Sequence, residues 1–156
     1  MRLYLLRHAD AESPRTTDAA RELTSEGKRQ AETVGACCRR LGLRPDVLLA
    51  SPYRRTVQTA EAVAAALEDV EVKTEGFLAS GMNPEAAYAG LQAYGWAGSM
   101  MLVGHQPDIG ELAASLLGLN DAGGMPVGKA TLIGMTVDRF APYAGSLDFF
   151  LPVEAM

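Results

Sequence analysis

Short apolar runs alternate along this chain with longer stretches in which apolar residues recur every three or four positions. The runs at residues 3–6, 47–50 and 100–103 are apolar throughout, which is typical of strands buried on both faces of a sheet. The periodic stretches begin near Thr24, after Ser51 and Pro52, and at Pro107, and each predicts a helix with one apolar face. Residues 84–94 are also expected to be helical. Strands that alternate with helices favour a three-layer α/β/α sandwich with a mostly parallel sheet.

The pattern also predicts where the helices begin and which faces they bury. Thr24 is the expected N-cap of the first helix and Gly42 its C′ residue, and Pro52 fits the first turn of the second helix. The residues expected to face inward are Ala31, Val34, Cys38 and Leu41 in the first helix and Val57, Ala60, Ala64 and Leu67 in the second. In the helix that begins at Pro107 they are Ile109, Leu112, Ala113 and Leu116.

The remaining segments are shorter or more polar. Residues 70–73 predict a weak strand, and residues 130–137 and 147–151 predict two strands paired as a hairpin. Loops are expected at 12–22 and 75–84, and residues 119–128 form a glycine-rich connection. We find neither repeats nor an interior linker, so residues 1–156 are expected to form one domain.

Composition excludes several classes of function. The net charge is −5 and no run of Lys or Arg occurs, which argues against binding to nucleic acid. No apolar stretch approaches the roughly 20 residues that span a bilayer, so no membrane association is expected. The adjacent Cys37 and Cys38 fit neither a structural disulfide nor a zinc site. These features favour a cytoplasmic protein.

Each of the three apolar strands ends in a polar cluster. Arg7 and His8 follow the first strand, residues 51–55 (SPYRR) follow the second, and residues 104–107 (GHQP) follow the third. If the strands are parallel, these clusters meet at one edge of the sheet, where ligand crevices form in such folds. Two histidines, two or three guanidinium groups and two helix N-termini would then surround one pocket, which favours a phosphoryl group.

Simpler interpretations of the same residues remain open. Arg7 could merely cap the sheet while His8 forms a hydrogen bond in the core. The chain has two histidines, and both directly follow apolar strands, which makes a chance arrangement less favourable. A metal site is disfavoured because two distant histidines lack a spaced Cys or carboxylate partner and neighbouring arginines would repel a cation. No metal and no cofactor are therefore expected.

These clusters resemble the motifs of the histidine phosphatase superfamily, which has the phosphoglycerate-mutase-like fold. Arg7 and His8 match its R-H-G/A signature, and residues 51–60 (SPYRRTVQTA) match its S-P-x-x-R-x-x-Q-T-A stretch. This register assigns the motif's arginine to Arg55 and not to Arg54. Residues 104–107 match the G-H-x-P turn, and residues 23–27 (LTSEG) match the L-T-x-x-G helix entry. Within the superfamily, the short chain most resembles the SixA-type phosphohistidine phosphatases.

The resemblance implies a two-step phosphoryl transfer without a cofactor. His8 would be the nucleophile, with Arg7, Arg55 and His105 as catalytic groups that also bind the phosphoryl group. Charge repulsion from both arginines and a protonated His105 would keep His8 neutral. Arg21 occupies the position of an arginine in SixA-type relatives, where it would add a phosphate or substrate contact. A solvated loop arginine is the equally open alternative. Arg15 and Arg54 are expected to be surface charges.

One departure from the family pattern concerns the general acid. Many relatives carry an acidic residue in an L-x-E setting, where this chain has residues 78–80 (LAS). Glu75 and Asp10 are the remaining candidates. A phosphorylated imidazole leaves more readily than an alkoxide, so the absence of that acid suits phosphohistidine. The expected partner is a phosphorylated protein, such as a histidine-containing phosphocarrier domain, or a small phosphorylated metabolite.

Two rival functions remain at the level of sequence. A small-molecule phosphomonoesterase or a phosphoglycerate-mutase-like enzyme would use the same nucleophile on another substrate. A phospho-ligand binding module without activity would be expected to lack His8 or His105, and both are present.

Overall fold

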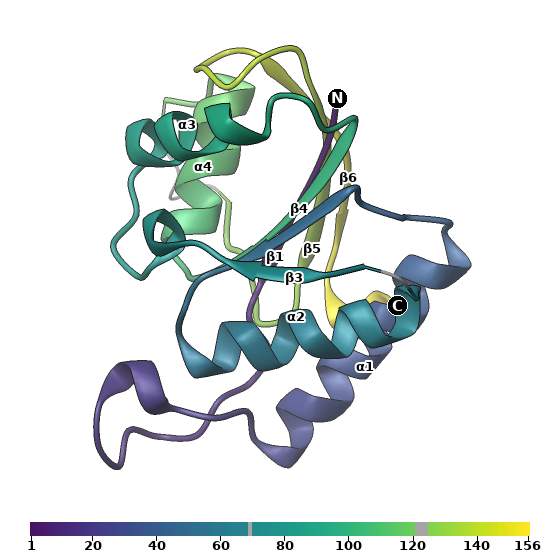
Figure 1. The fold of residues 1–156 in the computed structure, drawn as a ribbon, viewed down its shortest axis with the longest axis vertical. Coiled ribbons are helices and arrows are strands. Elements are labelled where there is room, and N and C mark those ends of the chain that lie inside the picture. Colours follow the sequence, from purple (N-terminus) through teal and green to yellow (C-terminus); the bar gives the residue numbers. More distant parts are fainter. Residues whose placement is uncertain (69, 121–124) are drawn as a thin grey trace.

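The computed structural model describes residues 1–68, 70–120 and 125–156. A six-stranded sheet with the order β3-β2-β4-β1-β5-β6 lies at its centre (Figure 1). The strands are β1 (Arg2–Arg7), β2 (Val47–Ala50), β3 (Val72–Thr74), β4 (Ser99–Gly104), β5 (Leu132–Val137) and β6 (Gly145–Leu151). The three predicted apolar strands are therefore confirmed as β1, β2 and β4.

Four strands of this sheet run parallel to one another. β4 pairs in parallel with both β1 and β2, and β2 pairs in parallel with β3. β5 runs antiparallel to β1 and forms an antiparallel pair with β6, which confirms the predicted hairpin. Because β1, β2 and β4 are parallel, their carboxyl ends meet at one edge of the sheet.

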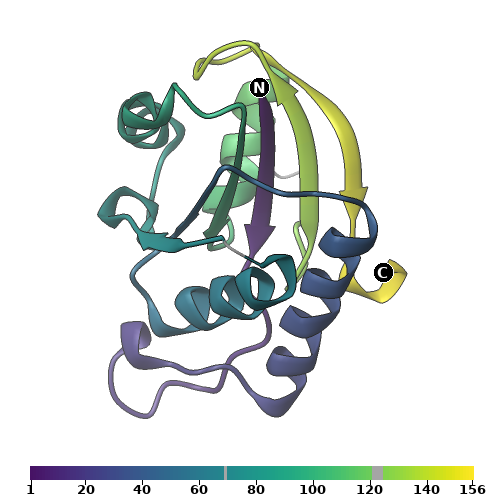
Figure 2. The same ribbon diagram turned by 45° about the vertical axis from the view of Figure 1, so that its right-hand side comes forward.

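Helices cover both faces of the sheet and form the outer layers of an α/β/α sandwich. α1 (Ser25–Arg40) and α2 (Arg54–Leu67) cover one face, while α3 (Pro84–Leu91) and α4 (Asp108–Leu117) cover the other (Figures 1 and 2). Each face buries its own apolar cluster, with Val34 and Val63 in one and Leu91 and Leu112 in the other. This arrangement confirms the predicted fold class. No helix among the described residues is long and apolar enough to cross a membrane.

Short 3-10 helices occupy the connections between these elements. They are η1 (Asp18–Ala20), η2 (Gly76–Leu78), η3 (Gln92–Tyr94) and η5 (Val153–Ala155). η1 lies within the expected loop 12–22 and η2 within the expected loop 75–84. The glycine-rich connection predicted at 119–128 lies partly outside the described residues, since 121–124 are not described.

The predicted ends of the first helix are confirmed. The Thr24 side chain accepts a hydrogen bond from the backbone N–H of Gly27 at 2.9 Å, as an N-cap does. Gly42 follows the helix with φ +66°, a left-handed conformation that glycine adopts without strain. The expectation that Leu41 faces inward was wrong: its side chain is 49% exposed, because it is the C-cap, while Cys37 is buried instead.

The predicted inner face of the second helix was also partly wrong. α2 begins at Arg54, so Pro52 precedes the helix and does not lie in its first turn. Val57 and Ala64 are only half-buried. The side chains buried on this helix are Arg55, Thr56, Thr59, Ala60, Val63 and Leu67. Polar residues are tolerated there because their donors find acceptors: the Thr56 and Thr59 hydroxyls donate to backbone carbonyls.

Candidate active site

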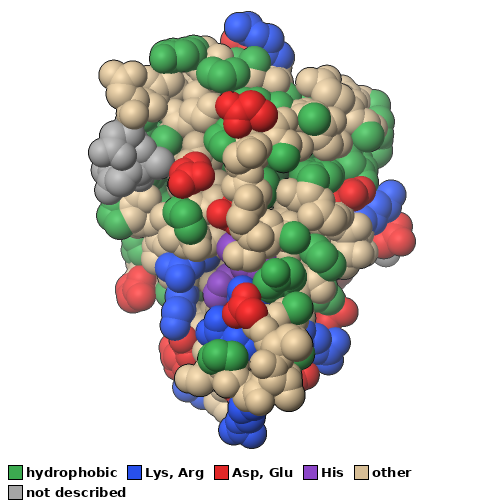
Figure 3. Space-filling model, turned by 90° about the vertical axis from the view of Figure 1, so that its left-hand side faces the viewer, with side chains coloured by type: hydrophobic (Ala, Val, Ile, Leu, Met, Phe, Trp, Pro, Cys, Tyr) green, Lys and Arg blue, Asp and Glu red, His purple; other side chains and the backbone are tan. Residues whose placement is uncertain are grey.

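His8 and His105 lie side by side at the carboxyl ends of β1 and β4. The parallel register pairs Arg7 with Gly104, and the His8 N–H donates to the Gly104 carbonyl at 3.0 Å. The two imidazole ring centres are 5.5 Å apart. Figure 3 shows histidine atoms in a hollow of the surface, bordered by Lys and Arg side chains and an acidic side chain. The topology therefore brings together the two histidines, as the sequence predicts.

Hydrogen bonding fixes which ring nitrogen of His8 carries the proton. Nδ1 lies 2.7 Å from the Ala9 carbonyl oxygen, which can only accept, so Nδ1 is the donor. Nε2 lies 3.2 Å from Nε–H of Arg55, which can only donate, so Nε2 holds a lone pair. Burial lowers the pKa of His8 to about 4, the Ala9 contact opposes the shift, and the charges of Arg55, Arg7 and Arg21 add to it. Neutral His8 thus presents an unprotonated nitrogen.

Arg55 occupies the centre of the site and is 4% exposed. Its Nε–H donates to His8, and its Nη2 donates to Nδ1 of His105 at 3.2 Å. The guanidinium carbon also lies 5.0 Å from the ring centre of Tyr53, close enough for a cation–π contact. Arg54 is exposed and pairs with Glu22 at 3.3 Å. Arg55, the arginine that the motif assigns, is therefore the one whose side chain is buried in the site.

His105 is neutral in this arrangement, and its tautomer is opposite to that of His8. Its Nδ1 accepts from Arg55, so its Nε2 carries the proton and donates to Oγ of Ser51 at 2.7 Å. Burial lowers the pKa of His105 to about 3, and the charge of Arg55 contributes further. The expectation of a protonated His105 was therefore wrong, because burial and the charge of Arg55 lower its pKa. The charges of Arg55 and Arg7 do lower the pKa of His8, as expected, but burial is the larger cause.

Arg7 lies beside the histidines, at the end of β1. Its Nη1 donates to the Val127 carbonyl at 2.9 Å, which fixes the side chain against the segment before β5. Its Nε is buried, and no acceptor among the described residues is bonded to it. Burial lowers the pKa of this guanidinium from its usual value. An oxygen of a bound phosphoryl group would satisfy such a donor.

The rim of the site carries further charges from loop 12–22. Arg21 donates to Oδ1 of Asp18 at 2.9 Å and to the Glu12 carbonyl at 2.6 Å. Its charge acts on His8, but its side-chain hydrogen bonds go to this loop. Asp18 in turn contacts Arg55, with Oδ2 accepting from Nη2 at 3.0 Å. Asp18 was not among the predicted site residues, and its only signal in the sequence is its i, i+3 spacing from Arg21.

The carboxylates considered as general acids are engaged elsewhere. Asp10 accepts from Lys129 and from Thr24, and both hydrogen bonds lower its pKa. Glu75 accepts a hydrogen bond from the Tyr94 hydroxyl. Ser80, where relatives place an acid, is exposed. Of these side chains, none has a hydrogen bond to either histidine.

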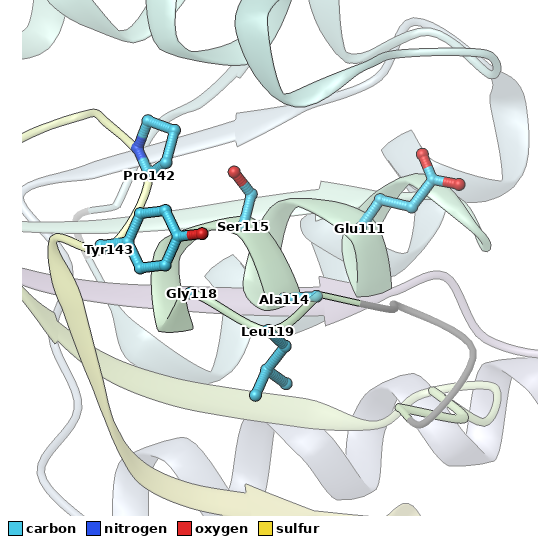
Figure 4. Close-up of a pocket in the computed structure, with 7 residues that line it drawn as sticks. All are labelled: Glu111, Ala114, Ser115, Gly118, Leu119, Pro142 and Tyr143. Atoms are coloured by element: carbon cyan, nitrogen blue, oxygen red, sulfur yellow. The ribbon is translucent and has the colours of Figure 1, made fainter.

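A second pocket lies away from the two histidines. A pocket of about 220 Å³ beside α4 is lined by Glu111, Ser115, Leu119 and Tyr143, among others, and has no cation in its lining (Figure 4). Within the described ranges, no group of three His, Cys, Asp or Glu side chains is placed to hold a metal ion.

Comparison with known proteins agrees with this geometry. Residues 3–79 match the family model described as histidine phosphatase superfamily, branch 1. A phosphohistidine phosphatase SixA homolog from Haemophilus influenzae is 30% identical over 129 residues, which is 76% of this chain and 78% of that protein.

Solved structures show the same fold. A candidate phosphohistidine phosphatase SixA from Agrobacterium tumefaciens has 25% identity and a TM-score of 0.83, over 97% of both chains. The protein histidine phosphatase SixA complexed with tungstate has a TM-score of 0.86 at 22% identity, over 98% of this chain and 97% of that one. An α-ribazole phosphatase from Shigella flexneri has a TM-score of 0.77 at 19% identity, over 98% and 97%. Motifs, fold and relatives agree: the chain belongs to the histidine phosphatase superfamily and is a SixA-type member of it.

Proposed function

We propose that this protein is a phosphohistidine phosphatase in which His8 transiently carries the phosphoryl group. The observation that carries the proposal is the tautomer of His8, whose Nδ1–H is bound to Ala9 and whose Nε2 lone pair faces the guanidinium of Arg55. A nucleophile must be unprotonated, and the lowered pKa keeps His8 neutral over the physiological range. Residues 1–156 would act as a single catalytic domain.

The proposed reaction proceeds in two displacements. Nε2 of His8 attacks phosphorus, the bond from phosphorus to the substrate nitrogen breaks, and the phosphoryl group is then on His8. Water attacks this intermediate, the new P–N bond breaks, and inorganic phosphate leaves while His8 regains its lone pair. Arg7 and Arg55 would bind the equatorial oxygens, where they stabilise the charge of a loose transition state. Nε–H of Arg55 would then donate to an oxygen in place of His8.

The acid–base inventory supports phosphohistidine as the substrate. A phosphohistidine ring that is protonated on its second nitrogen leaves as neutral imidazole, so it requires no proton from the enzyme. An alkoxide leaving group would gain about 10²–10⁴-fold from a positioned acid. Here Asp10 and Glu75 are bound to other partners and Ser80 replaces the acid of relatives. A protein that displays phosphohistidine is the partner we favour, and no metal or cofactor is required in the proposed steps.

A small phosphorylated metabolite is the second candidate, favoured by the fold shared with α-ribazole phosphatase. The two candidates differ in turnover. We would compare kcat/KM for a phosphorylated histidine-containing carrier domain with values for α-ribazole phosphate, 3-phosphoglycerate and an aryl phosphate. We expect the highest kcat/KM for the phosphoprotein. A kcat/KM for a metabolite that is tenfold higher would overturn the proposal.

The covalent intermediate needs a separate test. Brief exposure to labelled phosphoprotein and a denaturing quench should trap label that is lost in acid and retained in alkali, as expected of a phosphoramidate. A His8→Ala variant should trap none, whereas label that survives acid would exclude His8 as the carrier.

A further inference from the structure

Asp18 contacts the central arginine of the site from loop 12–22. Its carboxylate oxygen Oδ2 accepts from Nη2 of Arg55 at 3.0 Å, and its backbone carbonyl accepts from Nη1 at 2.7 Å. The arginine is buried, with 4% of its side chain exposed, while the aspartate is 51% exposed. A buried guanidinium is thus held by a residue of a surface loop.

The hydrogen bonds of Arg55 divide between the two edges of its guanidinium. Nε and one N–H of Nη2 form the side edge, which faces His8 and His105 at 3.2 Å each. Nη1 and the other N–H of Nη2 form the end edge, which Asp18 occupies. The side edge offers two parallel donors of the kind that bind a phosphoryl group in a bidentate manner.

Asp18 is itself held from its outer side. Its second carboxylate oxygen, Oδ1, accepts from Nη1 of Arg21 at 2.9 Å, and Arg21 also donates to the Glu12 carbonyl. Hydrogen bonds from Arg21 and then from Arg55 lower the pKa of this carboxyl group, so it stays ionised. The carboxylate therefore links two arginines, with one oxygen for each.

We propose that Asp18 is a positioning residue, which fixes the end edge of Arg55 so that its side edge faces the phosphoryl group between the two histidines. The inference rests on the proposed phosphatase function, since its consequence is catalytic. Misplacement of a positioned group by 1 Å can cost about 100-fold in rate. Loss of the carboxylate should therefore lower kcat. KM should change little, because removal of a negative charge favours an anionic substrate while loss of orientation disfavours it.

The test uses Asp18→Ala and Asp18→Asn with Glu22→Ala as the matched control. Glu22 lies in the same loop and forms an exposed pair with Arg54, which has no hydrogen bond to the histidines. We expect kcat for an aryl phosphate and for a phosphohistidine protein to fall about tenfold or more in Asp18→Ala, with KM within about threefold of the wild type. Asp18→Asn should recover part of the loss, since its amide oxygen can serve one arginine only. Glu22→Ala should resemble the wild type.

A double-mutant cycle separates positioning from general damage to the fold. In the Arg55→Lys background, Asp18→Ala should have less than about a threefold further effect, because no guanidinium remains to be oriented. Equal effects in both backgrounds would overturn the proposal.

A measurement that does not depend on turnover tests the role of Asp18 separately from the identity of the substrate. In protein labelled with ¹⁵N-arginine, exchange of the Arg55 Nε proton should accelerate in Asp18→Ala and not in Glu22→Ala. If aryl phosphate is cleaved and phosphohistidine is not, the proposed substrate fails while this inference stands. If kcat and proton exchange both match the wild type, the positioning role is refuted whatever the substrate.

Discussion

Nε of Arg55 lies 3.2 Å from Nε2 of His8, although 47 positions separate the two residues in the sequence. The contact joins the end of β1 to the start of α2. It places a permanent donor against Nε2 of His8, so this nitrogen holds a lone pair and the proton of the neutral ring is on Nδ1.

The first prediction concerns the identity of the working arginine. Lysine cannot reproduce the two parallel donors of Arg55, so Arg55→Lys should lose at least about 2 kcal/mol of transition-state stabilisation, about 30-fold in kcat/KM. Arg54→Lys, on the exposed neighbour, should be nearly silent. Steady-state kinetics on the two variants decides the matter, and the reverse ranking would show that the motif register is wrong.

The second prediction concerns pH. The pKa values of His8 and His105 are lowered to about 4 and about 3, so both rings should remain neutral at pH 6. NMR titration of protein with labelled histidine gives two imidazole signals to follow, and both midpoints should lie below pH 5. A midpoint near 6.5 for His8 would contradict the structure.

The same shifts predict how stability depends on pH. In the unfolded chain each histidine binds a proton near pH 6.5, while in the folded chain it does so near 4 or 3. Between these values the unfolded state binds more protons, so the free energy of unfolding is highest above about pH 6.5 and falls as the pH drops to about 4 for His8 and about 3 for His105. Urea unfolding at several pH values should show this slope, and His105→Gln should reduce it.

The third prediction concerns the hydrogen bond that orients His105. Ser51→Ala leaves the buried Nε2–H without its acceptor, which costs about 1–3 kcal/mol of the free energy of unfolding. Ser80→Ala removes the hydroxyl of an exposed loop serine and serves as the control. Urea denaturation of both variants checks the difference, and equal stability would mean that the Ser51 contact contributes nothing.

The fourth prediction concerns Gly27, in the first turn of α1, where the helix packs against the segment after β1. A Cβ on Gly27 would lie 1.9 Å from the backbone oxygen of Asp10, an approach that real atoms do not make. Gly27→Ala should therefore destabilise the fold by about 1–3 kcal/mol through overpacking. Gly76→Ala, where a Cβ meets nothing within 4 Å, should stay within about 0.5 kcal/mol of the wild type in the same urea titration.

The sequence predicts that four side chains lie close together, because their positions depend on the topology of the sheet. They are Arg7, His8, Arg55 and His105. Parallel strands place their carboxyl ends at one edge, and each of these side chains lies at such an end or within a few residues after it. Apolar runs alone were sufficient to locate β1, β2 and β4.

Other features depend on packing that no periodicity encodes. The inner face of α2 was misassigned because Thr56 and Thr59 satisfy their hydroxyls on the backbone and can therefore be buried. The charge of His105 was misjudged because burial, which a linear sequence does not display, lowers its pKa most, and the charge of Arg55 lowers it further. Asp18 was missed because a loop without regular spacing gives no indication of which way its side chains point.

The position of β1 in the sheet also constrains how this protein is made. Leu5 lies between Leu102 of β4 and Ile133 of β5, so the strand before His8 is synthesised long before either neighbour exists. Pairing of such distant segments must await closure of long loops, which slows folding. During synthesis the first strand therefore leaves the ribosome with both edges unpaired, and such edges are prone to aggregation until residue 137 has emerged.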